Sequence, residues 1–274
     1  MNKLLHAGFY RFKKSRIYAV CLAGVLLYCI FVNATQYFNK VKYGYELTVD
    51  PLIFNFLTMI GVVFSVFIGL YVGTEYGDGT IRNKLIVGMS RTGIYLSNLI
   101  ICTAGGMIII ITAYILNIGL GIPLFGTPEM GAAQFAVTLL NGICLGIAYI
   151  SIFNMIAMIN SNKTNGAVLC ILAAFAIVFI GILLFSQLSQ PEFVEHLVMK
   201  NGESMLETVK NSNYLSGTKR EIYQNMLELL PSGQAMMLVN HNEIHPLRMI
   251  AYSGLVTVVT NVIGISIFRR KDIK

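Results

Sequence analysis

The segment Gly73–Thr92 has the sequence GTEYGDGTIRNKLIVGMSRT and lies between two long stretches without charged residues. The first stretch runs from residue 51 to 74 and the second from 92 to 128, and neither contains Asp, Glu, Lys or Arg. A transmembrane helix needs roughly 20 consecutive apolar residues, so each stretch is long enough to cross a bilayer. The charged segment is therefore predicted to lie at one membrane face, between two spans.

The rest of the chain continues this pattern. Only 12% of its 274 residues are charged and 55% are hydrophobic, which excludes an ordinary soluble domain. Charge-free intervals of about 20 residues or more predict six transmembrane helices. We place them at 17–34, 52–73, 94–120, 133–159, 166–186 and 247–268. The predicted fold is an all-α integral membrane domain that covers residues 1–274.

The basic residues predict the orientation. Six spans place both termini on one side of the membrane, and that side carries most of the 20 Lys and Arg residues. It carries only three acidic residues, Glu75, Asp78 and Asp272. The positive-inside rule then makes both termini and Gly73–Thr92 cytoplasmic. Because the basic residues lie next to span ends and form no separate domain, we expect no nucleic-acid partner.

Residues 1–16 predict an amphipathic helix at the membrane interface. Its apolar side is formed by Leu4, Leu5, Ala7–Phe9 and Phe12, opposite Lys3, Arg11, Lys13 and Lys14. A cleaved signal peptide is the alternative, because Val32-Asn33-Ala34 resembles a cleavage site. Sixteen residues precede the apolar run, which favours a retained first span.

Three external connections are expected. The first, Asn33–Asp50, is short, and the second, Gly121–Gly131, is predicted to be a tight cap. The third, residues 186–246, is long and charged, and we predict short amphipathic helices within it at Glu192–Lys200, Glu203–Lys210 and Thr218–Leu230. A partly ordered loop is the alternative for this third connection.

The chemistry-bearing residues exclude several functions. The chain has no GxxxxGK[ST] motif, so it has no P-loop with which to hydrolyse ATP. Apart from Arg248 at the start of the last one, the predicted spans hold no charged residue and no histidine, which disfavours an intramembrane enzyme or an ion-coupled transporter. Asn55, Asn98 and Asn154 are candidates for the polar lining of a translocation path. Hydrogen bonding between packed helices is the alternative role for these asparagines.

Gly73–Thr92 itself predicts a short helix. Thr80 is the expected N-cap, and Ile81, Leu85 and Ile86 are expected to form one apolar side. Gly88 is expected to end the helix, and Ser90 or Thr92 to cap the next span. Such a helix would lie across the cytoplasmic end of the bundle, where it can dock on another protein.

The run Glu75-Tyr76-Gly77-Asp78-Gly79-Thr80-Ile81-Arg82, followed by Gly88-Met89-Ser90-Arg91, resembles the ABC type-2 exporter permease family. Met89 stands where that family often has a proline. The layout is also similar: an amphipathic N-terminal helix, six spans, cytoplasmic termini and a long external segment before the last span.

The resemblance implies that residues 73–92 form a coupling helix, which contacts a separate ATPase subunit. The implied interface residues are Glu75, Tyr76, Asp78, Gly79, Thr80, Ile81, Arg82, Lys84, Leu85, Ser90 and Arg91. Two such permease chains would assemble with two ATPase subunits in a bacterial plasma membrane. ATP and Mg would bind to the ATPases, and this chain would bind no cofactor or metal.

The function implied is export of a substrate such as a peptide, drug or lipid-like molecule, driven by ATP hydrolysis in the partner. The cargo is left open, as is the choice between a homodimer and a heterodimer. The alternative is an ATP-independent membrane-bound binding or immunity protein that captures a peptide or lipid through residues 186–246.

Overall fold

Six long helices form the body of the protein, and each overlaps most of one charge-free interval. They are α2 (Arg16–Tyr43), α4 (Leu57–Gly77), α6 (Arg91–Phe125), α7 (Ala132–Ile159), α8 (Lys163–Leu188) and α11 (Pro246–Arg270). The structure is a computed structural model that describes residues 2–44, 48–200, 203–241 and 245–272. All six helices are long and apolar enough to cross a membrane, α4 together with the short helix α3 (Asp50–Phe54) before it. Their number and positions agree with the six predicted spans.

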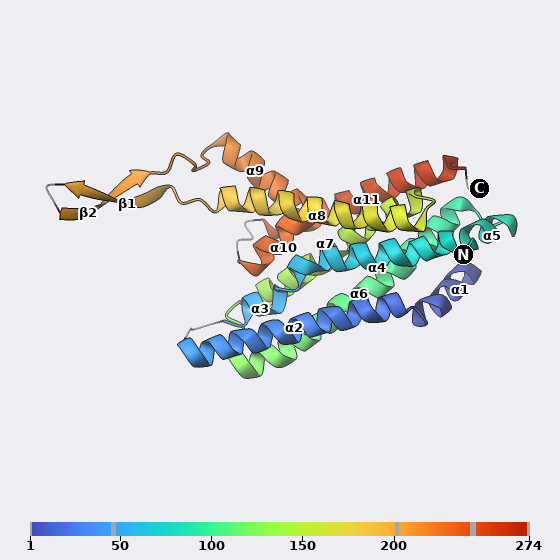
Figure 1. Cartoon of the computed structure of the whole chain (residues 1–274), viewed down its shortest axis with the longest axis horizontal. Helices are drawn as coiled ribbons and strands as arrows, with labels where there is room; N and C mark the ends of the chain where they lie inside the picture. The colour runs from blue at the N-terminus through green and yellow to red at the C-terminus, as the bar shows by residue number, and fades with distance from the viewer. Residues whose placement is uncertain (1, 45–47, 201–202, 242–244, 273–274) are drawn as a thin grey trace.

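The smaller elements lie at the two ends of this bundle (Figure 1). The helices α1 (Asn2–Lys13) and α5 (Thr80–Ile86) lie at the end that holds both chain termini, which we call the terminal end. At the opposite end, the strands β1 (Phe193–Lys200) and β2 (Glu203–Lys210) project away from the bundle. We call this the hairpin end. It also includes α9 (Thr218–Leu229) and α10 (Pro231–Val239).

Helices α4 and α7 form the centre of the bundle. Their apolar windows are 67% and 61% buried, against 22% for α2 and α8 and 11% for α11. Close packing of α4 on α8 depends on glycine: a Cβ atom added to Gly69 would lie 3.0 Å from the Cα of Ala167, and one added to Gly73 would lie 3.1 Å from the carbonyl oxygen of Lys163. Small residues permit such close approach between membrane helices.

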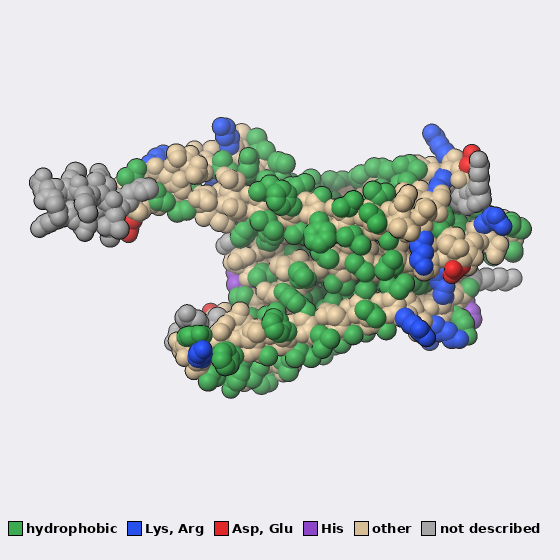
Figure 2. All heavy atoms as spheres, in the orientation of Figure 1, with side chains coloured by type: hydrophobic (Ala, Val, Ile, Leu, Met, Phe, Trp, Pro, Cys, Tyr) green, Lys and Arg blue, Asp and Glu red, His purple; other side chains and the backbone are tan. Residues whose placement is uncertain are grey.

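Side-chain type follows this arrangement on the surface. Figure 2 shows apolar side chains covering the flank of the bundle, while Lys and Arg side chains gather at the terminal end. The exposed apolar residues include Phe31 of α2, Phe179 of α8 and Val258 of α11. In water such a surface would be unstable, whereas against lipid tails it is the expected one.

Two of the predicted connections begin later than expected. Helix α2 continues to Tyr43 instead of stopping near residue 34, and Gly44 ends it with a φ of 69°. A left-handed residue at this position is the common end of a helix, and glycine adopts it without strain. Helix α6 likewise continues to Phe125, with Pro123 inside its last turn.

Two of the predicted external helices are wrong. Residues 193–200 and 203–210 form an antiparallel β-hairpin in which Val194 pairs with Val209. Asn201-Gly202, between the two strands in sequence, lies outside the described residues. An Asn-Gly pair between two short segments is a strong sequence signal for a hairpin, and the helical spacing of these segments was the weaker signal.

The third predicted helix is confirmed as α9. Directly after α9, Pro231 occupies the first turn of α10. Proline is favoured at this position, because the N–H group that it lacks has no partner within the helix.

Candidate functional site

Helix α5 is the short helix predicted between the second and third spans, but it begins differently. Gly79, with a φ of 67°, occupies the N-cap position. Thr80 is therefore the first helical residue rather than the cap, and its hydroxyl donates a hydrogen bond to the carbonyl of Glu75 at 3.0 Å. At the other end of this connection, Ser90 caps α6 by accepting a hydrogen bond from the Gly93 N–H, as predicted.

The end of α5 is fixed by a left-handed glycine. Gly88 has a φ of 85°, the Gly88 N–H bonds to the carbonyl of Leu85 at 2.9 Å, and the Met89 N–H bonds to the carbonyl of Lys84 at 3.0 Å. This pair of hydrogen bonds is the Schellman motif. The chain consequently turns sharply from α5 into α6, in agreement with the prediction that Gly88 ends the helix.

The two faces of α5 differ from the predicted ones. Ile81 is fully buried and Leu85 is partly buried, whereas Ile86 and Val87 are 74% and 75% exposed. Ile86 lies five residues after Ile81, and at 3.6 residues per turn it points about 140° away from it. The exposed surface of α5 thus combines two apolar side chains with Arg82 and Asn83.

Glu75, in the last turn of α4, lies inside the protein rather than at its surface. Its side chain is only 2% exposed and receives three donors. Arg11 Nη1 lies 3.1 Å and Lys84 Nζ 2.7 Å from Oε1, while the Asn98 Nδ2 group donates to Oε2 at 2.7 Å. These four residues, which we call the Glu75 cluster, join α1, α4, α5 and α6. A buried carboxylate is stable only with such partners.

Arg11 also fastens α1 to the bundle. Its Nη2 group donates to the carbonyl of Tyr71 at 3.2 Å, and its guanidinium lies 4.4 Å from the centre of the Tyr71 ring. The Tyr71 hydroxyl in turn donates to the carbonyl of Gly8 at 3.2 Å. The sequence placed Arg11 on the polar side of an interfacial helix; the structure instead turns it toward α4.

A second group of contacts holds the end of α11. Arg91 donates to the carbonyls of Phe268, at 3.2 Å, and of Lys271. Lys271 Nζ donates to the Tyr76 hydroxyl at 3.2 Å and to the carbonyl of Met158 at 3.3 Å. Burial lowers the pKa of Lys271 to about 8. We call Tyr76, Arg91 and Lys271 the C-terminal clasp.

The predicted interface residues therefore divide into two groups. Asp78, Arg82 and Ser90 are exposed, and Tyr76, Gly79, Thr80, Lys84, Leu85 and Arg91 are partly exposed. Glu75 and Ile81 are buried, so their side chains face this chain and not a partner. The contacts of Arg11 and Lys271 were not predicted, because no spacing rule relates residues so far apart in the chain.

Two cavities flank α5 at the terminal end. One, of about 380 Å³, is lined by residues that include Asp78, Ile81, Arg82 and Ser161. The other, of about 310 Å³, lies between α1 and α5 and is lined by Leu4, Ala7, Thr80, Asn83, Lys84, Val87 and Met89. Helix α5 therefore projects between two cavities, and this shape suits docking into another protein.

The asparagines proposed for a translocation path make contacts within the bundle. Asn98 belongs to the Glu75 cluster, and the Asn55 Oδ1 atom accepts a hydrogen bond from the Tyr28 hydroxyl at 2.5 Å. Asn154 is fully buried close to the Tyr95 hydroxyl. The contacts of Asn55 and Asn98 support the alternative role, hydrogen bonding between helices.

A second polar network lies at the hairpin end, around Glu228 of α9. Its side chain is 0% exposed. Arg248 Nε lies 2.5 Å from Oε2, while Gln224 Nε2 and His245 Nδ1 lie 3.0 Å and 3.2 Å from Oε1. Burial raises the pKa of Glu228, but the bonds from Arg248, Gln224 and His245 outweigh this effect and hold the pKa below its usual value. These four residues, the Glu228 network, tie α9 to α11.

Within the described part of the chain, no three His, Cys, Asp or Glu side chains are grouped as a metal ion would require. The polar clusters at both ends are instead ion pairs and hydrogen bonds. Their arrangement favours a mechanical role, in which short helices are attached firmly to long ones.

Comparison with known families identifies this architecture. The sequence model of the family described as "ABC-2 family transporter protein" matches residues 4–181, from α1 into α8, and so includes α5 and the Glu75 cluster. A search of curated proteins finds no match. Permeases of this family lack an ATPase domain and typically pair with ATPase subunits. Because the match covers more than half of the chain, the protein belongs to the ABC-2 transporter family and is a multi-pass membrane permease component.

Proposed function

We propose that this chain is the membrane subunit of an ATP-driven exporter, and that α5 receives the movement of a separate ATPase subunit. The observation that supports this proposal is the attachment of α5 to the spans through the buried Glu75 cluster. Lys84 of α5, Asn98 of α6 and Arg11 of α1 all contact Glu75 at the end of α4. A force applied to α5 would therefore move these helices together.

The docking surface that we propose is the exposed side of α5. Arg82 and Asn83 supply polar groups, and Ile86 and Val87 supply two apolar side chains that have no cover in this chain. A small apolar centre with a polar rim is typical of protein interfaces. The resemblance assigned Arg91 and Glu75 to the same interface. We propose that they support it from within this chain: Arg91 holds the end of α11, and Glu75 holds its cluster together.

The orientation follows from charge. The terminal end carries most of the Lys and Arg residues, so we place it in the cytoplasm, with both termini and α5. The hairpin end is then extracytoplasmic. Two permease chains and two ATPase subunits would form the working assembly, with ATP and Mg bound to the ATPases. A peptide, drug or lipid-like substrate would move outward along the contact between the two permeases.

Co-purification tests this proposal. The tagged chain is expressed with a candidate ATPase encoded beside it in the genome, and the amount of ATPase recovered is measured. Arg82→Glu and Val87→Asp are expected to abolish recovery, because they reverse a charge and bury a carboxylate at the docking surface. Lys13→Glu is the matched control, since Lys13 is exposed at the same end but lies on α1.

The same experiment separates the alternative function. An ATP-independent capture protein would remain functional without any ATPase and would be insensitive to Arg82→Glu and Val87→Asp. If both variants keep the ATPase and its ATP-dependent transport, α5 is not the docking helix and the proposal is wrong.

A further inference from the structure

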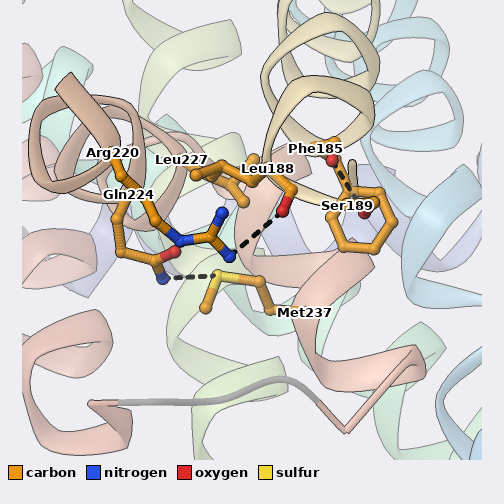
Figure 3. Close-up of a pocket in the computed structure, with 7 residues that line it drawn as sticks. All are labelled: Phe185, Leu188, Ser189, Arg220, Gln224, Leu227 and Met237. Carbon is orange, nitrogen blue, oxygen red and sulfur yellow. Dashed lines mark hydrogen bonds between the residues drawn. The ribbon is translucent and has the colours of Figure 1, made fainter. Parts of the chain in front are cut away.

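A pair of cavities at the hairpin end is not explained by coupling to an ATPase. The smaller, of about 210 Å³, lies between α8, α9 and α10 and is lined by Phe185, Leu188, Ser189, Arg220, Gln224, Leu227 and Met237 (Figure 3). The larger, of about 560 Å³, is lined by Gly217, Arg220, Glu221, Gln224, Asn225, His245 and Arg248. Arg220 and Gln224 line both, so the two cavities meet at these side chains.

Arg220 has an unused hydrogen-bond donor at this meeting point. Its Nη2 group donates to the carbonyl of Leu188 at 3.2 Å, and its guanidinium lies 5.2 Å from the centre of the Tyr214 ring. Its Nη1 group is buried and has no hydrogen-bond acceptor. A buried N–H of a charged group without an acceptor is costly, and a bound anion would remove that cost.

The neighbouring charges are already paired, which leaves Arg220 as the cation that faces the cavities. Arg248 bonds to Glu228, and His245 and Gln224 bond to the same carboxylate. Glu221, on the larger cavity, is exposed. The site thus offers one guanidinium at its centre, with polar groups in the larger cavity and mainly apolar groups in the smaller one.

The apolar cavity is continuous with the lipid-facing surface of α8. Phe175, Ile182 and Phe185 follow one another at seven and three residues and lie along one side of the helix. Phe175 and Ile182 are exposed, and Phe185 lines the cavity. An acyl chain lying along this side of α8 would reach the cavity without leaving the bilayer.

Helix α9, which carries Arg220, has an apolar side that suits the membrane interface. Its residues Ile222, Met226 and Leu229 are exposed, and their spacing puts them on one side of the helix. An apolar side on an otherwise polar helix is typical of a helix that lies in the membrane interface. Arg220 would therefore be at the depth at which phosphate groups occur.

We infer that the paired cavities bind a membrane phospholipid, with its phosphate on Arg220 and the start of an acyl chain in the smaller cavity. Arginine and phosphate form strong, charge-assisted hydrogen bonds. The larger cavity would hold the rest of the headgroup, between Glu221 and the Glu228 network. This site lies beyond residue 181, where the family match ends, and it does not depend on the proposed export function.

Native mass spectrometry of the delipidated full-length chain tests this inference. Phosphatidylglycerol is expected to bind one to one, while a diacylglycerol with the same chains and inorganic phosphate alone bind weakly. Arg220→Gln is expected to weaken phosphatidylglycerol binding at least about tenfold, the order of one charge-assisted hydrogen bond. Lys219→Gln is the matched control: it removes the same charge from the adjacent, exposed position and should leave binding unchanged.

A second variant guards against an effect of Arg220 on folding. Ser189 is exposed and lines the smaller cavity, so Ser189→Trp should fill that cavity while Arg220 keeps its bond to Leu188. It is expected to reduce binding as Arg220→Gln does. Equal binding by Arg220→Gln and Lys219→Gln, undiminished binding by Ser189→Trp, or equal binding of diacylglycerol would each overturn the inference. Full competition by inorganic phosphate would make this a free-anion site and would also overturn it.

Discussion

Arg11 of α1 and Glu75 of α4 form an ion pair of 3.1 Å, and this pair joins the helix before the first span to the end of the second. The carboxylate is almost completely buried, whereas the guanidinium side chain is 30% exposed. Lys84 of α5 shares the same carboxylate oxygen at 2.7 Å. Glu75 is therefore the residue through which the two short helices of the terminal end are attached to the spans.

Glu75→Gln should destabilise the protein strongly. It removes the negative charge but leaves Arg11 and Lys84 in place, and breaking a buried ion pair typically costs about 3 to 5 kcal/mol. Because both cations are partly exposed, we expect about 3 kcal/mol, measured as the free energy of unfolding in a detergent titration. Asp78→Asn, at an exposed position, should change it by less than about 0.5 kcal/mol.

A double-mutant cycle between Arg11→Gln and Glu75→Gln checks the cause. The two changes should be clearly non-additive, because each removes the same contact. Additive effects would show that Glu75 stabilises the protein without Arg11.

The C-terminal clasp predicts a stability that depends on alkaline pH. The pKa of Lys271 is about 8 in the folded chain, below its usual 10.5, because the amine is buried. Between these two values the unfolded chain binds more protons than the folded chain, so stability should rise as the pH increases from about 8 to about 10.5. Melting temperatures at pH 7.5 to 10 should show this rise in the wild type and a smaller one in Lys271→Met. Parallel curves for the two proteins would contradict the prediction.

The Glu228 network predicts a pH dependence of the same sign, but in the acidic range. The pKa of Glu228 is held below its usual 4.5, so its contribution is fully present above pH 4.5 and is lost as the pH falls through the folded-state value. Glu228→Gln should lose this contribution at neutral pH and release α9 from α11. Hydrogen exchange of residues 218–229 would then be faster in the variant. Glu221→Gln, on the exposed side of the same helix, should leave the exchange unchanged.

The β-hairpin should be dispensable for folding. β1 and β2 pair with each other and project from the bundle, so the spans bury little against them. Replacing residues 193–210 with a short Gly-Ser linker should leave the melting temperature of the bundle unchanged. A large decrease would mean that the hairpin stabilises the transmembrane helices; a loss of transport alone would assign it a functional role.

The sequence predicted the transmembrane part well because insertion into a bilayer is governed by local composition. Each span must be apolar along about 20 residues, wherever it lies in the fold. The ends of helices were predicted where a single residue decides them, as Gly88 and Ser90 do. The error at Thr80 arose because Gly79, in a left-handed conformation, caps the helix one residue earlier.

The short external segments were harder, because eight residues with mixed apolar spacing fit either a helix or a strand. For residues 193–210, the pairing of the two segments on either side of Asn201-Gly202 in sequence decides the structure. Helix α9 was predicted correctly, because its helical spacing continues over 12 residues. The short helix α5 was predicted in position, but the contacts around it were not. Glu75 looked like part of an exposed interface, since nothing near it in sequence indicates that Arg11 approaches it.

The sequence by itself determined that this chain has six helices long and apolar enough to cross a membrane, and a short helix between the second and third of them. Those features depend on local hydrophobicity and on capping residues. Only the tertiary structure decided that Glu75 is buried among Arg11, Lys84 and Asn98, and that Arg220 faces two joined cavities. The physical reason is that a charge can be buried only where distant parts of the chain supply its partners, and packing alone determines which parts those are.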